Sequence, residues 1–214
     1  MEYNTGNYDK YMSRNPLKRL MVSRLNSRIL GLVRNAVEEQ RKDNTHSPVK
    51  ILDAGCGEGF ISEILFSNLS GVQITGLEYT DEALKIARSM NSGIVFMQGD
   101  IMQMPFKDGS FDVVLCTEVL EHLSDPSKAL AELLRVAKGR VIVTVPHEPW
   151  FCLGNMLALK NITRFGNPID HVNHWSYRAF TSFLKNNSNV SWMLGKSFPW
   201  TIAQSDLSYA GIQR

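Results

Sequence analysis

The chain opens with one long amphipathic pattern. Asn15 and Pro16 have the form of a helix start, with Asn as the N-cap and Pro in the first turn. Apolar residues then recur at helical spacing as far as Val37, and the polar stretch 38–47 follows. The pattern predicts one long helix with an apolar face. Its lysines and arginines fall mostly on the opposite side, as on a solvated helix face.

From residue 48 onward, short apolar runs alternate with helical segments. Continuous Val, Ile and Leu runs of this length are typical of parallel strands buried on both faces. We therefore expect an α/β domain with helices on both faces of a sheet. The expected strands are 49–54, 73–78, 94–98, 111–117 and 140–145, and the expected helices are 59–68, 81–91 and 125–138, the last with Asp125 as its cap, Pro126 at its first position and Gly139 as its stop.

The last third of the chain is less regular. Residues 147–175 carry many aromatics and few periodic features, which predicts an irregular insertion with short helices. A helix is expected over 177–186. Two further strands are expected over 190–196 and 207–213, as a closing hairpin.

Composition narrows the class of protein. The formal net charge is +2, which argues against a dedicated nucleic-acid binder. The three cysteines form no paired framework, and this favours a reducing compartment. Residues 1–15 lack the apolar stretch of a signal peptide, and no apolar run approaches the roughly 20 residues that span a bilayer. These features predict a cytoplasmic protein.

A glycine-rich turn, ILDAGCGEG at residues 51–59, follows the first predicted strand. Glycines let the backbone turn tightly and let a ligand lie against it. Glu78 follows Gly55 by 23 positions and ends the second strand. A Rossmann-like fold places a carboxylate there to accept hydrogen bonds from ribose hydroxyls. The sequence therefore predicts a nucleoside-like ligand.

The charges around this turn distinguish between candidate ligands. The dinucleotide fingerprint is G-x-G-x-x-G/A, but here the third glycine, Gly59, arrives one residue early. Asp53 and Glu58 are acidic, which opposes a pyrophosphate and suits a cation. S-adenosylmethionine carries a sulfonium and an ammonium and has no phosphate. The pattern therefore favours S-adenosylmethionine over NAD as the cofactor.

Acidic residues finish four successive predicted strands, namely Asp53, Glu78, Asp100 and Glu118. Open α/β sheets bind ligands at this edge, and Asp100 is placed to accept from the exocyclic amine of an adenine. Each acid taken singly also fits a helix cap or a solubilising loop residue. The ordered set favours a binding edge.

These stretches together resemble the class I (Rossmann-like) S-adenosylmethionine-dependent methyltransferases, in the type 11-like small-molecule group that includes quinone-biosynthesis enzymes. The matching stretches are 49–59, 76–78, 98–106 and 111–123. The resemblance implies a doubly wound, seven-stranded sheet, mostly parallel with an antiparallel last strand. It implies that Gly55 and Gly57 approach the amino-acid part of the cofactor, Glu78 the ribose, and Asp100 with Ile101 the adenine. The full set of expected cofactor-binding residues is Asp53, Ala54, Gly55, Cys56, Gly57, Glu78, Tyr79, Gly99, Asp100, Ile101, Met102, Glu118, His122 and Tyr11.

On this interpretation residues 1–214 form a single methyltransferase domain. Its expected parts are an N-terminal helical lid (1–47), a cofactor-binding core (48–146), a substrate-side insertion (147–176), and a C-terminal helix with closing strands (177–214). Tyr3, Tyr8 and Tyr11 fit either a lid over the cofactor or ordinary packing. Phe151, Phe165 and Trp175 fit either an apolar acceptor pocket or the core.

Methyl transfer from a sulfonium is an in-line displacement, and a general base helps only where the acceptor must lose a proton. The candidate bases are His122, His147, His171 and His174, although each also fits a structural histidine. We choose His147 because its strand end should face the acceptor. Asp170, His171 and His174 suggest a metal site, but no further Cys or His pair at ligand spacing accompanies them. We therefore expect no metal.

The expected partner is a small-molecule methyl acceptor, and no nucleic-acid partner is expected. Two other functions stay open. An RNA or protein methyltransferase predicts a basic cleft near the strand ends, whereas the basic residues cluster on the first helix. A non-catalytic S-adenosylmethionine-binding module predicts cofactor binding without turnover.

Overall fold

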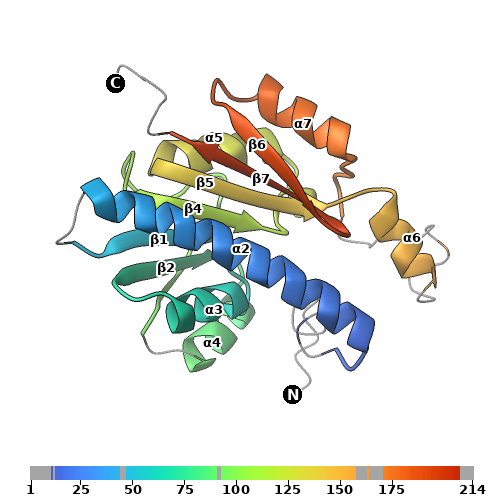
Figure 1. The fold of residues 1–214 in the computed structure, drawn as a ribbon, viewed down its shortest axis with the longest axis horizontal. Helices are drawn as coiled ribbons and strands as arrows, with labels where there is room; N and C mark the ends of the chain where they lie inside the picture. Colours follow the sequence, from blue (N-terminus) through green and yellow to red (C-terminus); the bar gives the residue numbers. More distant parts are fainter. Residues whose placement is uncertain are drawn as a thin grey trace.

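A seven-stranded sheet forms the centre of the molecule in a computed structural model that describes residues 11, 13–43, 47–90, 93–157, 163 and 171–207. The strand order is β3-β2-β1-β4-β5-β7-β6 (Figure 1). The first five strands pair in parallel, and β7 pairs antiparallel with both β5 and β6. The predicted fold class is therefore confirmed. The strands are β1 (Val49–Ala54), β2 (Val72–Glu78), β3 (Val95–Gln98), β4 (Phe111–Thr117), β5 (Ala137–Pro146), β6 (Trp192–Ser197) and β7 (Trp200–Asp206).

Helices cover both faces of this sheet. Successive side chains of a strand point to opposite faces, so each strand contributes to the core on both sides. Ile51 and Val113 share one core cluster with residues of α2 (Pro16–Asp43), α3 (Phe60–Asn68) and α4 (Asp81–Met90). Leu52 and Val114 share the other cluster with residues of α5 (Pro126–Val136) and α7 (Tyr177–Asn186). A short 3-10 turn, η1 (Leu120–His122), follows β4, and α6 (Trp150–Leu157) follows β5. Within the described ranges, none of the helices combines the length and apolar character needed to cross a membrane.

The predicted helix starts are capped as the sequence indicates. Asn15 Oδ1 accepts from the backbone N–H groups of Leu17 and Lys18, at 2.9 and 3.2 Å. Asp125 Oδ1 accepts from the backbone N–H of Lys128 at 3.0 Å. These bonds satisfy N–H groups that have no partner inside the helix. Helix α2 continues past the last predicted apolar position to Asp43, because the polar stretch contains good helix formers and neither Gly nor Pro.

Gly139 is not a helix stop, which corrects the predicted boundary. Helix α5 ends at Val136 and β5 begins directly at Ala137. A Cβ on Gly139 would lie 2.5 Å from the backbone oxygen of Asp112 and 2.8 Å from Gln40 Nε2. The glycine is therefore explained by the close approach of the neighbouring strand β4, a contact that the local pattern does not reveal.

The prediction also placed the closing strand at the wrong residues. Strand β7 spans Trp200–Asp206, whereas the predicted strand was 207–213. Strand β7 contains the polar residues Thr201 and Ser205, although both are fully buried. The segment therefore lacks the continuous apolar run from which a buried strand is predicted. Leu207 lies just past the strand, and residues 208–213 lie outside the described residues.

Candidate functional site

A cavity of about 650 Å³ opens at the carboxyl ends of the parallel strands. The turn after β1, the end of β2, the segment after β3 and the segment after β4 contribute to it. This is the edge at which open α/β sheets bind ligands. The lining residues are Gly55, Gly57, Glu58, Leu77, Glu78, Tyr79, Thr80, Ala83, Gly99, Asp100, Ile101, Met102, Glu118, Val119, His122, Leu123, Ser124 and Val172.

The glycine turn requires glycine at more than one position. Gly55, Gly57 and Gly59 have φ values of 78°, 53° and 80°, in the left-handed region that disfavours other residues. A Cβ on Gly55 would lie 2.5 Å from Val119 Cγ2. The Gly55 N–H donates to the backbone oxygen of Leu77 at 2.7 Å, which ties the turn to β2. The backbone is thus fixed and open toward the cavity.

Glu78 holds the glycine turn from the end of β2. Its Oε2 accepts from the Gly57 N–H at 3.0 Å. Its Oε1 accepts from the backbone N–H and the hydroxyl of Thr80, both at 2.9 Å. A carboxylate has about four acceptor positions, so Glu78 keeps capacity for a ligand hydroxyl.

Asp53 lies beneath the turn and not in the cavity wall. It is fully buried, and the Ser62 hydroxyl donates to its Oδ2 at 2.6 Å. Its Oδ1 has no hydrogen-bond partner in the described part of the chain. Burial raises the pKa of Asp53 to about 6, and the charge of Glu78 adds to that rise. Ala54, the next residue, is also fully buried.

The segment after β3 forms a second wall. The Met102 N–H donates to Asp100 Oδ1 at 2.8 Å, and the Gly99 N–H donates to the backbone oxygen of Glu78 at 2.9 Å. Asp100 therefore has one oxygen engaged in its own turn. Ile101 is buried and Met102 partly buried, so the same turn adds apolar surface to the wall.

A second, smaller cavity of about 20 Å³ shares Gly55, Glu58 and Glu118 with the large one and includes Tyr11 and Cys56. The ring of Tyr11 stacks on Phe60, with centroids 4.3 Å apart. Burial and the negative charges of Asp53 and Glu118 raise the pKa of the Tyr11 hydroxyl. Burial raises the pKa of the Cys56 thiol in the same way. Tyr3 and Tyr8 lie outside the described residues.

The predicted histidines separate into two groups. His122 lines the large cavity, and its ring lies 4.9 Å from that of His171. His147 does not line that cavity: it is half-buried, with its ring 6.3 Å from that of Tyr177. Burial lowers the pKa of His147, and the nearby positive charge of Lys196 lowers it further. His174 lies 3.9 Å from a carboxylate oxygen of Glu148.

The aromatic residues of the insertion are also divided. Trp175 packs against Phe180 and Phe183 in the core, with ring centroids 5.6 and 4.7 Å apart. Phe151 stacks on His171 at 5.6 Å and so stays near the candidate site. Phe165 lies outside the described residues.

Several lining residues were missed by the sequence prediction. Thr80, Val119 and Ser124 lie within a few positions of predicted site residues, so their places after strand ends were a usable signal. Val172 had no such signal, because it reaches the cavity from a distant and irregular segment.

The chain is similar in sequence and in fold to known methyltransferases. Residues 52–144 match the family model described as Methyltransferase domain. Ajmaline N-methyltransferase from Rauvolfia serpentina is 34% identical over 112 residues, which is 49% of this chain and 38% of that protein. Demethylmenaquinone methyltransferase from Renibacterium salmoninarum is 35% identical over 104 residues, which is 48% of this chain and 43% of that protein. The chain thus spans about two fifths of the length of these relatives.

Among solved structures, magnesium protoporphyrin IX methyltransferase from Synechocystis PCC 6803, with bound SAH, has a TM-score of 0.64. It is 17% identical, and the match covers 95% of both chains. This likeness shows the fold, and the family match shows the domain. Residues 52–144 therefore match a methyltransferase domain, and the fold of the chain is that of a solved methyltransferase, in agreement with the resemblance drawn from the sequence.

Proposed function

We propose that this chain transfers the methyl group of S-adenosylmethionine to a small-molecule acceptor. The observation that carries the proposal is the charge of the large cavity. Glu58, Glu78, Asp100 and Glu118 line it, and the described lining contains neither Lys nor Arg. Such a wall favours a cationic nucleoside and offers no Lys or Arg side chain to a pyrophosphate.

The buried carboxylate of Asp53 fits the same ligand. Its Oδ1 lacks a hydrogen-bond partner in the described structure, directly beneath the glycine turn. A buried carboxylate is costly unless a positive charge or hydrogen bonds compensate it. The ammonium group of S-adenosylmethionine on the turn would supply that positive charge. We therefore assign the amino-acid part of the cofactor to Gly55 and Gly57, above Asp53.

The remaining contacts follow from the two strand ends. Glu78 would accept from the ribose hydroxyls with its remaining lone pairs. Asp100 would accept from the adenine amine, while Ile101 and Met102 contact the ring. Tyr79, Gly99, Glu118 and His122 complete the wall of the cavity. Tyr11 and Cys56 would act from the smaller cavity, on the α2 and α3 side of the turn.

When bound, S-adenosylmethionine supplies a methyl group on a positively charged sulfur. The chain has to hold the acceptor in line with that methyl group and to exclude water. We propose His147 as the base for acceptors that lose a proton. Its lowered pKa keeps the imidazole neutral near pH 7, which a base requires.

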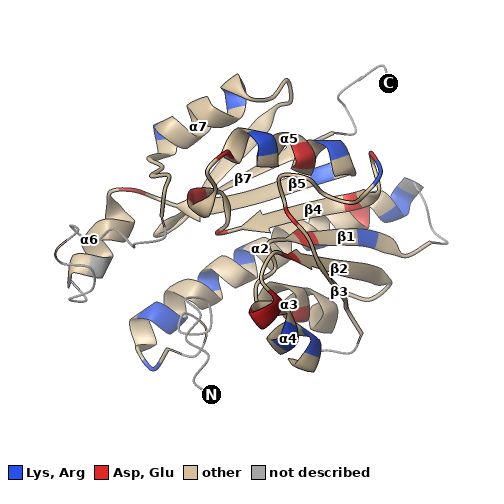
Figure 2. Ribbon diagram, turned by 180° about the vertical axis from the view of Figure 1, so that it is seen from behind, with Lys and Arg blue, Asp and Glu red and all other residues tan. Residues whose placement is uncertain are grey.

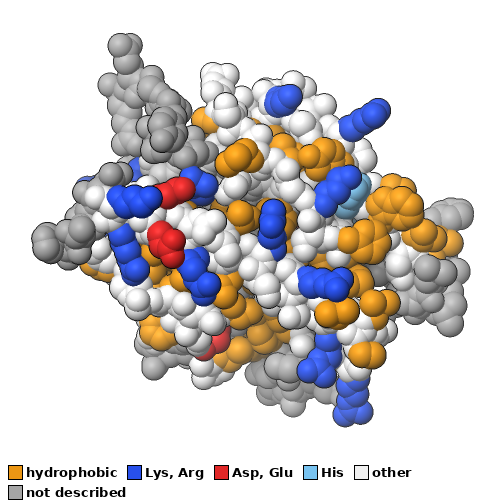
Figure 3. Space-filling model, viewed as in Figure 1, with side chains coloured by type: hydrophobic (Ala, Val, Ile, Leu, Met, Phe, Trp, Pro, Cys, Tyr) orange, Lys and Arg blue, Asp and Glu red, His pale blue; other side chains and the backbone are white. Residues whose placement is uncertain are grey.

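We propose that the acceptor binds on the side of α6, where exposed apolar residues gather. Trp150, Leu153 and Met156 are exposed on α6, and the ring of Trp150 lies 6.4 Å from that of the exposed Phe198. Figure 3 shows apolar side chains gathered where α6 lies. Lys and Arg instead recur along α2 (Figure 2), so the charge distribution gives no support to a basic cleft for RNA. Two relatives, ajmaline N-methyltransferase and demethylmenaquinone methyltransferase, have names that agree with a small organic acceptor.

Calorimetry with S-adenosylhomocysteine tests the cofactor assignment. We expect Glu78→Ala to weaken binding at least about tenfold, because one hydrogen bond to a charged group contributes about 1.5–3 kcal/mol. Glu82→Ala is the matched control, since Glu82 is an exposed acid on α4 outside the cavity. Equal affinity of the Glu78 variant and wild type, with both folded, would refute the ribose role.

A turnover assay separates an enzyme from a binding module. Wild-type protein is incubated with S-adenosylmethionine and a panel of phenols, amines and hydroxylated small molecules, and S-adenosylhomocysteine formation is measured. An acceptor-dependent signal supports the enzyme. Tight cofactor binding with no turnover on any acceptor supports the non-catalytic alternative. NADH, added separately in a thermal-shift assay, should leave the melting temperature unchanged.

A further inference from the structure

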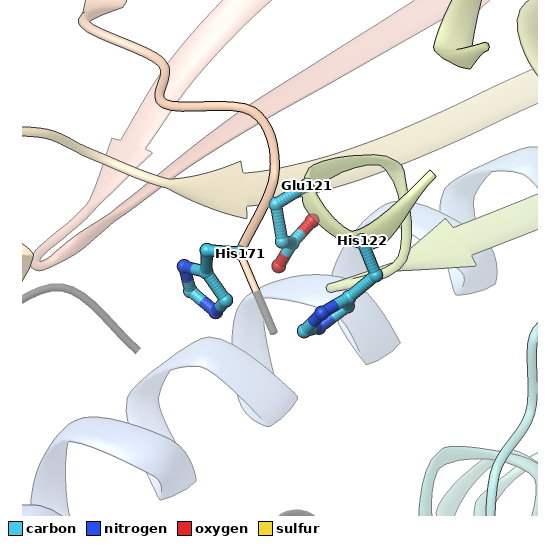
Figure 4. A group of neighbouring side chains, drawn as sticks. All are labelled: Glu121, His122 and His171. Atoms are coloured by element: carbon cyan, nitrogen blue, oxygen red, sulfur yellow. The ribbon is translucent and has the colours of Figure 1, made fainter. Parts of the chain in front are cut away.

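Three potential metal ligands from two distant segments meet beside the large cavity. Glu121 and His122 belong to η1, and His171 comes from the irregular segment before α7. Their three side chains point toward one another (Figure 4), and one ligand atom from each lies within 4.8 Å of the other two. Because His122 also lines the cavity, the cluster adjoins its wall.

The backbone holds this cluster together. The N–H groups of Val172 and Asn173 both donate to the backbone oxygen of Glu121, at 2.8 and 2.9 Å. The side-chain amide of Asn173 donates to two further carbonyl oxygens around the same turn, at 3.1 and 2.7 Å. Phe151 stacks on the ring of His171. The position of His171 against η1 is thus fixed by several independent contacts.

The donor set is one that transition metals use. Two imidazoles and one carboxylate bind Zn²⁺ or Fe²⁺ in sites that keep open positions for water or substrate. Ligands on opposite sides of an ion at about 2.2 Å are about 4.4 Å apart, which is close to the 4.8 Å within which the three ligand atoms lie. Glu121 is only 1% exposed, and a bound cation would offset the cost of burying its carboxylate.

We propose that Glu121, His122 and His171 bind a divalent transition-metal ion whose open positions hold an oxygen of the methyl acceptor. Metal binding is inferred from the cluster alone. The binding of the acceptor's oxygen to the ion also rests on the proposed function. A hydroxyl bound to such an ion has a lowered pKa, so it gives up its proton more readily, to a base or to water. The acceptor class is therefore a small molecule with a coordinating hydroxyl or phenol group. This proposal departs from the sequence-based expectation of no metal, which considered His171 with His174 instead.

Metal uptake is the first test. Wild-type protein is stripped with EDTA and exposed to Zn²⁺, Mn²⁺ or Mg²⁺ alone, and metal content and melting temperature are measured after desalting. We expect about one Zn²⁺ or Mn²⁺ per chain and a raised melting temperature. His171→Ala and His122→Ala should lose both effects. His174→Ala is the control, because this residue is of the same type, three positions from His171 and outside the cluster.

Three outcomes would overturn the site: no uptake by folded wild type, uptake by His171→Ala equal to wild type, or equal loss in His174→Ala. Calorimetry with S-adenosylhomocysteine on the stripped protein keeps the two proposals apart. Cofactor binding without metal uptake removes only the metal site, whereas metal uptake without cofactor binding removes the proposed function. Turnover on a hydroxylated acceptor that is unchanged by EDTA would remove the ion's role toward the acceptor.

Discussion

The buried carboxyl group of Asp53 should make the stability of the fold depend on pH. The group is fully buried in β1, and burial raises its pKa from 3.8 to about 6. The folded chain therefore holds this proton more tightly than the unfolded chain does. The resulting stabilisation is fully present below about pH 4 and is lost as the pH rises through about 6.

The size of the effect follows from the two pKa values. A difference of about two pH units corresponds to about 3 kcal/mol of unfolding free energy between acidic and neutral solution. Asp53→Asn keeps the shape of the side chain and removes the ionisation. Relative to wild type, this variant should gain up to about 3 kcal/mol between about pH 4 and about pH 8. Glu82→Gln, which removes an exposed carboxylate, should show no comparable gain.

Urea unfolding of the three proteins at several pH values measures this difference directly. A constant free-energy gap between Asp53→Asn and wild type across the range would refute the burial argument. The same titration reports on the ligand. A cation bound above Asp53 would lower its pKa, so binding of S-adenosylhomocysteine near pH 6 should release a fraction of a proton. Calorimetry in buffers of different ionisation enthalpy should detect that release in wild type and not in Asp53→Asn.

Two further substitutions probe the turn and the proposed base. Gly55→Ala places a Cβ 2.5 Å from Val119 Cγ2 at a φ of 78°, so it should cost about 1–3 kcal/mol in urea unfolding and weaken S-adenosylhomocysteine binding. Gly31→Ala on α2 meets nothing within 4 Å and should be neutral or stabilising; equal effects of the two would contradict the steric argument. His147→Ala should slow turnover on a protic acceptor about 10²- to 10⁴-fold with cofactor affinity unchanged, and a wild-type rate would remove it as the base.

Local patterns predicted the parts of the fold that local interactions determine. Strands β1 and β4 and helix α7 begin and end at the predicted residues. The two strands are mainly apolar runs and the helix has an amphipathic pattern, and residues that favour turns or caps flank each of them. The boundary between α5 and β5 was wrong because the chain passes from helix to strand without a turn. Gly139 looked like a stop signal, and its true reason is a contact with Asp112 on a neighbouring strand.

The candidate site also has a part that local patterns predict and a part that depends on contacts between distant segments. Glu78, Asp100 and Glu118 could be placed together because the carboxyl ends of parallel strands meet at one edge. The cluster of His171 with Glu121 could not be found in this way. It depends on backbone bonds that Val172 and Asn173 make to a turn about fifty positions earlier in the chain, and no spacing rule encodes that contact.

Strand β7, whose position the sequence did not predict, contacts the candidate site through Glu118. Glu118 has a φ of 60°, a conformation that costs a non-glycine residue about 1–3 kcal/mol and persists only where its surroundings hold it. The Trp200 indole N–H, from the start of β7, donates to Glu118 Oε2, and the Glu118 N–H donates to the backbone oxygen of Thr144 at 3.1 Å. Glu118 in turn lines both cavities. Strand β7 therefore does more than close the sheet, because its first residue helps to hold a carboxylate of the cavity wall in a strained position.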